Sequence, residues 1–150
     1  MAQLAQINIA RLKAPIDHPS IADFTNNLDL INSIAEQSEG FVWRLKDDAT
    51  NNATTLNPYN DPLIIVNISV WKDLHSLKSF VYNTKHLQFF MRRKEWFESM
   101  KEAHMALWII EDNIFPDAQE GKLRLDGLQK NGHSSYSFDF KSYDLYASAT

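Results

Sequence analysis

Strict alternation of side-chain character over short segments is the feature that most constrains the fold of this chain. It is clearest in residues 64–71, where an aliphatic row at the even positions alternates with a mixed row at the odd positions. Residues 5–10 and 105–110 alternate in a similar manner. This pattern predicts β-strands whose two faces lie in different environments.

The mixed rows of these predicted strands indicate a ligand cavity. If the segments pair, one face of the sheet carries two asparagines, a serine and two tryptophans: Asn8, Asn67, Ser69, Trp71 and Trp108. Such a face is too aromatic for open solvent and too polar for an ordinary core. The mixture is typical of the wall of a small-molecule site.

The other segments complete an α+β plan. Strands are predicted at residues 4–10, 41–46, 63–71 and 104–111, with a short edge strand near 136–140. Apolar residues at steps of three and four predict helices over 21–34, 74–81 and 86–100, and a short helix ending at Asn131 and Gly132. We therefore predict a ferredoxin-like βαββαβ fold with a C-terminal extension, as one domain over residues 1–150.

The uncovered face of the predicted sheet indicates that the chain associates with a second copy of itself. We expect helices to cover one face only, over the aliphatic rows, so that Trp71 and Trp108 share the other face. Large aromatic side chains are unfavourable in water, and a second copy packed sheet to sheet would cover them. The expected assembly is a homodimer in the form of a dimeric α/β barrel.

Composition excludes several functional classes. The chain has 0 Cys and only 4 Gly, without a G-x-G-x-x-G or Walker pattern, so thiol chemistry and nucleotide-phosphate cradles are not expected. A net charge of -4 disfavours nucleic-acid binding. Metal-ligand spacing, a signal peptide and a membrane-spanning run are lacking, which predicts a cytoplasmic protein with neither a metal site nor a membrane partner.

Three motifs resemble those of a known family. They are Gly40-Phe41-Val42-Trp43-Arg44, Val66-Asn67-Ile68-Ser69-Val70-Trp71, and Phe80-Val81-Tyr82 followed by His86 and Arg92-Arg93-x-x-Trp96-Phe97. Over about residues 3–140 the chain is similar to an uncharacterised domain family of the dimeric α/β-barrel superfamily, often described as antibiotic biosynthesis monooxygenase-like. The resemblance implies a small-molecule monooxygenase-like activity without fixing a reaction.

The resemblance also implies roles for two residues of the third predicted strand. Cofactor-free monooxygenases of this superfamily use an Asn and a Trp four residues later, and Asn67 and Trp71 have this spacing. A carboxamide can bind a substrate oxygen or oxyanion, and an indole N–H can anchor a carbonyl. The Tyr that those enzymes carry six residues after the Trp is replaced by Leu77. The alternative is that Asn67 pairs with Ser69 or the backbone while Trp71 fills the barrel.

His86 is the candidate general base or, if haem is bound, the axial ligand. Arg93 follows at helical spacing and could hold a carboxylate or a propionate. Haem-binding relatives use a His from this general region, but their motif does not align with this chain. The alternative is a histidine that hydrogen-bonds in a packed corner.

These observations predict a monooxygenase-like enzyme that acts on an apolar aromatic or polyene molecule. Its expected catalytic residues are Asn67, Trp71 and His86. The expected substrate-binding residues are Asn8, Trp43, Ser69, Tyr82, Arg93 and Trp108. We expect no cofactor, with haem as the alternative. The alternative function is a non-catalytic protein that binds such a molecule or haem.

Overall fold

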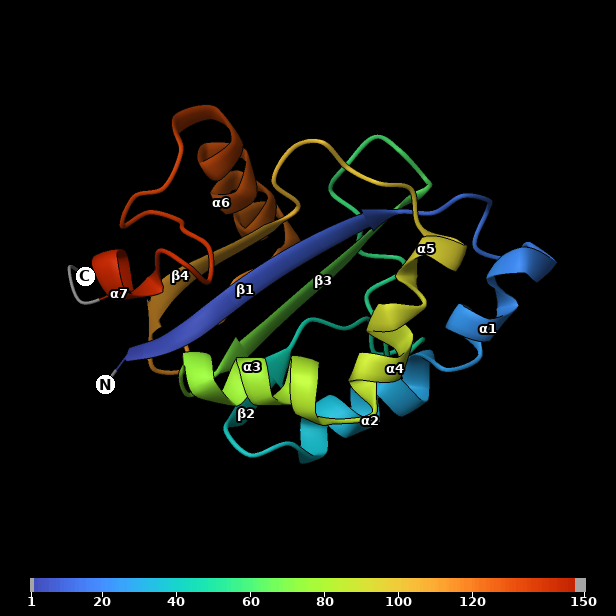
Figure 1. The fold of residues 1–150 in the computed structure, drawn as a ribbon, viewed down its shortest axis with the longest axis horizontal. Helices are drawn as coiled ribbons and strands as arrows, with labels where there is room; N and C mark the ends of the chain where they lie inside the picture. Colours follow the sequence, from blue (N-terminus) through green and yellow to red (C-terminus); the bar gives the residue numbers. More distant parts are fainter. Residues whose placement is uncertain (1, 148–150) are drawn as a thin grey trace.

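The computed structural model describes residues 2–147, which contain an antiparallel sheet of four strands (Figure 1). The strands are β1 (Ala2–Arg11), β2 (Phe41–Arg44), β3 (Ile64–Trp71) and β4 (Met105–Glu111), in the spatial order β2-β3-β1-β4. Two central strands joined to the edge strands through helical crossovers are the ferredoxin-like arrangement. The predicted α+β class is therefore confirmed.

The helices that follow β1 and β3 cover one side of the sheet. We call this side the front face; it carries the side chains of Gln6, Ser69 and Leu107. The first crossover forms η1 (Pro19–Ile21), α1 (Ala22–Thr25) and α2 (Leu28–Gln37), and the second forms α3 (Leu74–Asn83), α4 (His86–Met91) and α5 (Arg93–Trp96). Both expected long helices are thus interrupted, the first at residues 26–27 and the second at residue 92.

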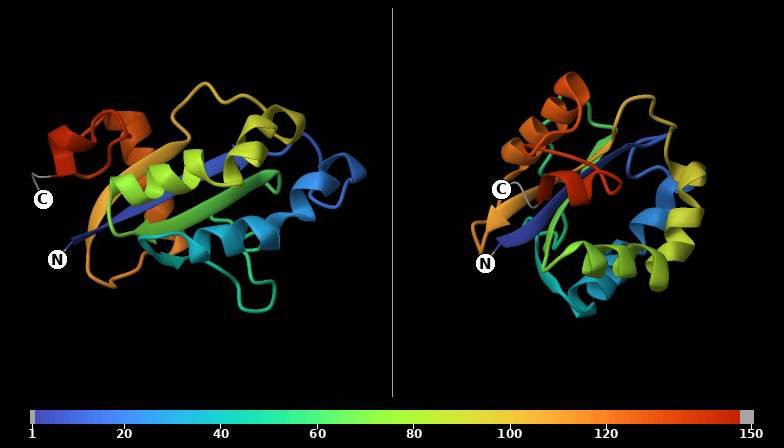
Figure 2. Two further views of the ribbon diagram at one scale, coloured as in Figure 1. Left: turned by 60° about the horizontal axis from the view of Figure 1, so that its bottom comes forward. Right: turned by 60° about the vertical axis from the view of Figure 1, so that its left-hand side comes forward.

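The C-terminal part covers the other side, which we call the back face and which carries Ile7 and Ile68. Helix α6 (Ala118–Asn131) lies across it, opposite α2 and α3 (Figure 2). A Cβ atom at Gly121 would lie 2.5 Å from Ile68 Cδ1, so the glycine permits close contact between α6 and the sheet. Short helix α7 (Tyr143–Tyr146) follows, and the expected edge strand near Phe138 is reduced to a single bridge with Leu107.

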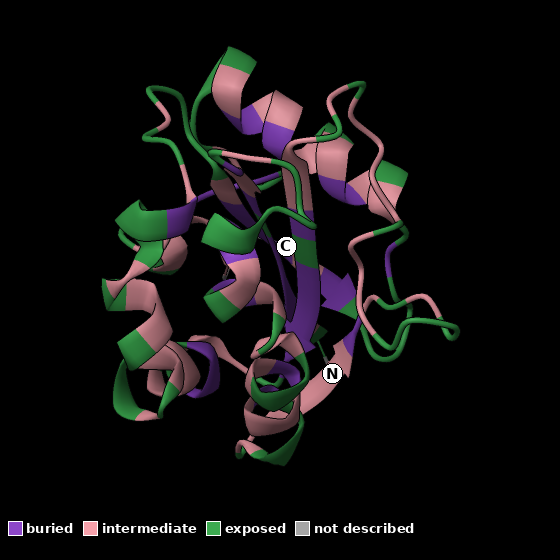
Figure 3. Ribbon diagram, turned by 90° about the vertical axis from the view of Figure 1, so that its right-hand side faces the viewer, coloured by how far each residue is buried: buried purple, intermediate pink, exposed green. Residues whose placement is uncertain are grey.

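Burial shows that both faces of the sheet are covered within one chain, whereas we expected one bare face. Buried residues are concentrated in the strands and on the inner sides of the helices (Figure 3). The aliphatic rows of β1 and β3 lie on the back face under α6, and the mixed row of β3 lies under the crossover helices. The expected placement of the helices was therefore inverted.

Trp71 and Trp108 lie on opposite faces, which corrects the prediction that they share one cavity. In the pairing of β1 with β4, Gln6 is opposite Leu107 and Ala5 is opposite Trp108. Trp71 consequently packs with Leu107 on the front face, while Trp108 packs under α6. Both rows of β4 are apolar, so alternation alone did not indicate which row joins which face.

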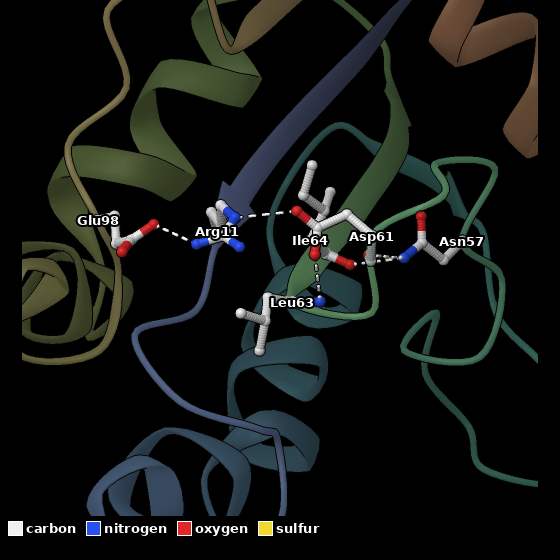
Figure 4. A network of polar contacts seen from close by, with 6 residues as sticks. All are labelled: Arg11, Asn57, Asp61, Leu63, Ile64 and Glu98. Carbon is white, nitrogen blue, oxygen red and sulfur yellow. Dashed lines mark hydrogen bonds and ion pairs between the residues drawn. The ribbon is translucent and has the colours of Figure 1, made fainter.

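A polar network at the end of β1 fixes two long loops (Figure 4). The guanidinium of Arg11 contacts Asp61 at 2.9 Å and Glu98 at 2.6 Å. Asn57 donates to the carbonyls of Asp61 and Ile64, at 2.8 and 2.9 Å. These contacts attach the excursion between β2 and β3, and the segment after α5, to the end of the sheet.

Within residues 2–147, no helix combines the length and the apolar character that crossing a membrane requires.

Candidate functional site

A row of polar side chains crosses the middle of the front face. Asn8 of β1 is opposite Asn67 of β3, and Gln6 is opposite Ser69. The amide Nε2 of Gln6 donates to Asn67 Oδ1 at 2.7 Å and to Ser69 Oγ at 2.7 Å. Trp71 Nε1 also donates to Ser69 Oγ, at 2.8 Å. Three predicted site residues of β3 are therefore connected through Gln6 and Ser69.

The row changes from buried to exposed along β3. Trp71 is 0% exposed and Ser69 is 6% exposed, whereas Asn67 and Asn8 are both exposed. The Oδ1 atom of Asn67 is occupied by Gln6, and within the described residues its Nδ2 forms no hydrogen bond. Asn67 therefore presents amide N–H donors to the solvent, where they could bind an oxygen atom of a ligand.

The ring and the indole N–H of Trp71 are both engaged by other residues of the protein. Its ring packs edge-on against Phe41, with centroids 5.4 Å apart, and stacks on Phe80 at 5.2 Å. Because its indole N–H already donates to Ser69, it has no donor left for a substrate carbonyl. In this arrangement Trp71 anchors Ser69 and, through Gln6, the orientation of Asn67.

His86 lies at the start of α4 in an aromatic corner. Its ring is 4.6 Å from the Phe80 centroid and 6.4 Å from the Phe90 centroid. Nδ1 lies 3.2 Å from the carbonyl oxygen of Val81, which can only accept, so Nδ1 carries the proton and Nε2 carries the lone pair. Burial lowers the pKa of His86, and the Val81 hydrogen bond opposes this effect only in part.

The residues predicted to accompany His86 lie toward the outside of the same corner. Arg93 is exposed, its guanidinium is 4.2 Å from the Phe90 centroid, and it donates to the Phe90 carbonyl at 2.9 Å. Tyr82 is 43% exposed and meets Phe90 edge-on. Phe80 connects His86 to Trp71, and no hydrogen bond within residues 2–147 joins His86 to Asn67.

Two predicted substrate-binding tryptophans are not at this site. Trp43 is paired with Val70 and packs in the back-face core, where its ring stacks on Phe115 at 4.9 Å. Trp108 belongs to the same back-face core. The sheet therefore separates both rings from Asn67, because neighbouring residues of a strand point to opposite faces.

Sequence reasoning missed Gln6 and Arg44. Arg44 is opposite Ser69 and is only 6% exposed. Its Nη2 contacts Asn51 Oδ1 at 3.0 Å and Glu36 at 3.7 Å, while its Nε has no hydrogen-bond partner among the described residues. The available signal for Gln6 was its position two residues before Asn8 in an alternating strand, since this places both amides on one face.

The surroundings of His86 do not fit an axial haem ligand. A haem requires an open apolar slot beside the ligating nitrogen, whereas the His86 ring is packed against Phe80 and Phe90. A pocket of about 280 Å³ is instead lined by strand ends and α7, including Leu4, Ile109 and Tyr143. Within residues 2–147, no cluster of three or more His, Asp or Glu side chains is arranged to hold a metal ion.

Comparison with known proteins agrees with this architecture. The model of a domain of unknown function, DUF3291, matches residues 3–149. A conserved protein from Methanosarcina mazei Go1 is 15% identical and has a TM-score of 0.51, over 74% of this chain and 93% of that chain. SnoaB, a cofactor-independent oxygenase from Streptomyces nogalater, is 14% identical and has a TM-score of 0.50, over 77% of this chain and 100% of its own. At these identities the similarities establish a shared fold. No curated protein matches the sequence.

Proposed function

Because this chain belongs to the DUF3291 family and exposes the amide donors of Asn67 at the open end of the front face, we propose that it is a small-molecule, monooxygenase-like enzyme. Its proposed substrate is an apolar aromatic or polyene molecule bound over the Asn67 end of the polar row. The observation that carries the proposal is the hydrogen bond from Gln6 to Asn67 Oδ1, at 2.7 Å, which directs the Asn67 donors outward.

The chemistry that suits these donors is stabilisation of an enolate oxygen. A substrate with an acidic C–H group, such as an anthrone, can lose a proton to give an aromatic enolate that transfers electrons to O₂ without a cofactor. One anthrone and one O₂ then give one anthraquinone and one water. Asn67 would stabilise the negative oxygen formed on deprotonation. The fold shared with SnoaB, a cofactor-independent oxygenase, supports this class of reaction.

His86 is the proposed base for the deprotonation. The other four histidines are exposed, whereas His86 is partly buried and packs against Phe80. Its Nε2 lone pair and lowered pKa keep it in the neutral, proton-accepting form near neutral pH. Proton transfer would require substrate bound between His86 and Asn67.

One observation favours the second candidate function, a protein that binds such a molecule without turnover. Leu77 occupies the position of the expected tyrosine and is 3% exposed, and the Trp71 N–H is committed to Ser69. Asn67 therefore lacks the acidic neighbour that a catalytic site of this type would use.

The test uses anthrone as the probe. Oxygen uptake and the absorbance of the quinone product are measured for the wild type, for Asn67→Ala and for a control, Asn60→Ala, which changes an exposed asparagine of the β2–β3 loop. Loss of a single oxyanion donor typically costs about 10²–10³-fold in turnover, so we expect this loss in Asn67→Ala and none in the control.

The outcomes separate the two functions. Stoichiometric anthrone binding without oxygen uptake, abolished by Asn67→Ala, would favour the binding protein over the enzyme. If the wild type neither binds nor oxidises anthrone and other flat phenolic ketones, the proposed function is wrong.

We also propose that the protein forms a homodimer. Helix α6 covers the back face, so the contact would use other surfaces. Two apolar residues of the β4–α6 connection are candidates, because Ile114 is 65% and Phe115 is 37% exposed. Light scattering should give twice the chain mass of 17.3 kDa, and a stable monomer at micromolar concentration would contradict the proposal.

A further inference from the structure

Three hydrogen-bond donors of neighbouring residues on the back face have no acceptor among the described residues. They are the indole Nε1 of Trp108, the Nε of Arg124 and the hydroxyl of Ser137, and all three atoms are buried. Trp108 is 0% and Ser137 is 1% exposed. Buried donors normally have a partner, so three such groups in one region require an explanation.

The three residues are neighbours. The bridge between Leu107 and Phe138 places Ser137 beside Trp108 at the edge of β4. Arg124 reaches down from α6, with its guanidinium carbon 5.6 Å from the Trp108 ring centroid. Its Nη1 donates to the carbonyl of Tyr136, the residue before Ser137, at 2.8 Å. One region therefore brings the three donors together from β4, α6 and the C-terminal segment.

The chemistry of the donors indicates what would satisfy them. Ser137 Oγ could accept from either N–H, yet it forms neither hydrogen bond in the structure. A water molecule between them would itself need acceptors for two protons, and of the three groups only Ser137 can accept. An ion that accepts from all three donors has no such requirement.

Charge favours an anion. The guanidinium of Arg124 is permanently positive, and its Nη2 forms an ion pair with Glu120 at 3.3 Å. Nη1 is engaged by a neutral carbonyl, which leaves Nε without a partner. We propose that Trp108, Arg124 and Ser137 form a binding site for a small monovalent inorganic anion, a halide. The site lies across the sheet from Asn67 and does not depend on the proposed function.

The first test is crystallographic. Crystals of the full-length protein grown or soaked in sodium bromide should show an anomalous peak within hydrogen-bond distance of Trp108 Nε1 and Ser137 Oγ. Absence of a peak there in bromide would contradict the proposal.

The second test is thermal unfolding in solution. The midpoint temperature is compared in sodium bromide and in sodium gluconate at the same ionic strength, since gluconate is a far larger anion than bromide. At ten times the dissociation constant, ligand linkage predicts a rise of about 3–6 °C in halide for a chain of this size.

Variants assign the effect to the site. Ser137→Ala and Arg124→Gln should reduce the difference between bromide and gluconate. The control is Arg92→Gln, because Arg92 also lies over a tryptophan, 4.8 Å from the Trp96 centroid, but bonds to Glu95 and Asp23. This variant should retain the halide-dependent rise.

Each remaining outcome is decisive. A rise that persists in Ser137→Ala means that the halide acts elsewhere, which overturns the proposal. A bromide peak without a halide-dependent rise means binding at crystal concentration only, which overturns a solution site. If Arg124→Gln does not fold, Ser137→Ala and the bromide peak still decide the question.

Discussion

The indole Nε1 of Trp71 donates to Ser69 Oγ at 2.8 Å, and the two residues are 0% and 6% exposed. The same hydroxyl accepts from Gln6, which also binds Asn67. A fully buried aromatic residue is thereby connected to an exposed amide through two intermediates. The exposed part of the site depends on buried groups that contact no ligand.

Ser69→Ala should destabilise the protein. It removes the acceptor of two buried donors, Trp71 Nε1 and Gln6 Nε2, and an unsatisfied buried donor costs about 1–3 kcal/mol. Urea unfolding should show this loss in the free energy of unfolding. The control Ser135→Ala, at an exposed serine, should lie within about 0.5 kcal/mol of the wild type. Equal stability of the two variants would mean that the network contributes nothing.

Two glycines of α6 offer a matched comparison of close packing. A Cβ at Gly121 would lie 2.5 Å from Ile68 Cδ1 in the core, whereas a Cβ at Gly127 would meet the Tyr136 ring at 2.9 Å. Tyr136 is 44% exposed, so its ring can yield more readily than a core side chain can. Alanine is favoured over glycine in a helix by about 1 kcal/mol.

We therefore expect opposite effects from the same substitution. Gly121→Ala should lower the free energy of unfolding by about 1–3 kcal/mol, as overpacked cores do, and Gly127→Ala should leave it unchanged or raise it. Chemical unfolding measures both. A Gly121→Ala variant as stable as Gly127→Ala would show that α6 does not need its close approach to the sheet.

How far the sequence predicts this fold is clear from β3 and β4. In β3 one row is aliphatic and the other contains Asn67 and Ser69, so alternation separated its two faces correctly. In β4 both rows are apolar, and Trp108 was assigned to the wrong face. Which row of side chains lies on which side of the sheet is decided by the register with the neighbouring strand. The residues of β4 alone do not indicate their register with β1.

The candidate site was predicted in part for a related reason. Asn67, Ser69 and Trp71 share a face because residues two apart on one strand always do, and Asn8 shares it because it is paired with Asn67. Gln6 was missed because its importance depends on the register that places it opposite Ser69. The interruption of the helix after His86 also coincides with a tertiary contact that the sequence does not indicate, the ion pair of Arg92 with Asp23.

Asp73 caps α3, and its removal should weaken the protein in a pH-dependent manner. Its Oδ1 accepts from the Ser76 amide at 2.8 Å, and this hydrogen bond lowers the pKa of Asp73 below 3.8. Asp73→Ala should cost about 1 kcal/mol at pH 7, measured by urea unfolding. The control Asp48→Ala changes an exposed carboxylate and should have little effect.

The pH dependence has a defined sign. A carboxyl group with a depressed pKa contributes stability that is present above its unfolded pKa and lost as pH falls through its folded pKa. The difference between wild type and Asp73→Ala should therefore shrink below about pH 4. A difference that stays constant into strong acid would mean that the charge of the cap is irrelevant.

Protonation of His86 should destabilise the fold. Burial lowers its pKa from 6.5, so between the folded and unfolded pKa values the unfolded chain binds more protons. The contribution of the neutral ring to the free energy of unfolding is fully present above pH 6.5 and is lost as the pH falls below that value. The total loss is about 1.4 kcal/mol for each unit by which the folded state depresses the pKa.

The measurement compares wild type and His86→Gln by urea unfolding between about pH 5 and pH 7.5, the range in which an imidazole titrates. The wild-type free energy of unfolding should fall more steeply toward acid, because the glutamine does not titrate. NMR of the ring protons should place the midpoint of His86 below 6.5. Parallel pH profiles for the two proteins, together with an undepressed midpoint, would show that the ring is solvated in solution. The lone pair on Nε2 would then not be held in the packed corner that its proposed role as a base requires.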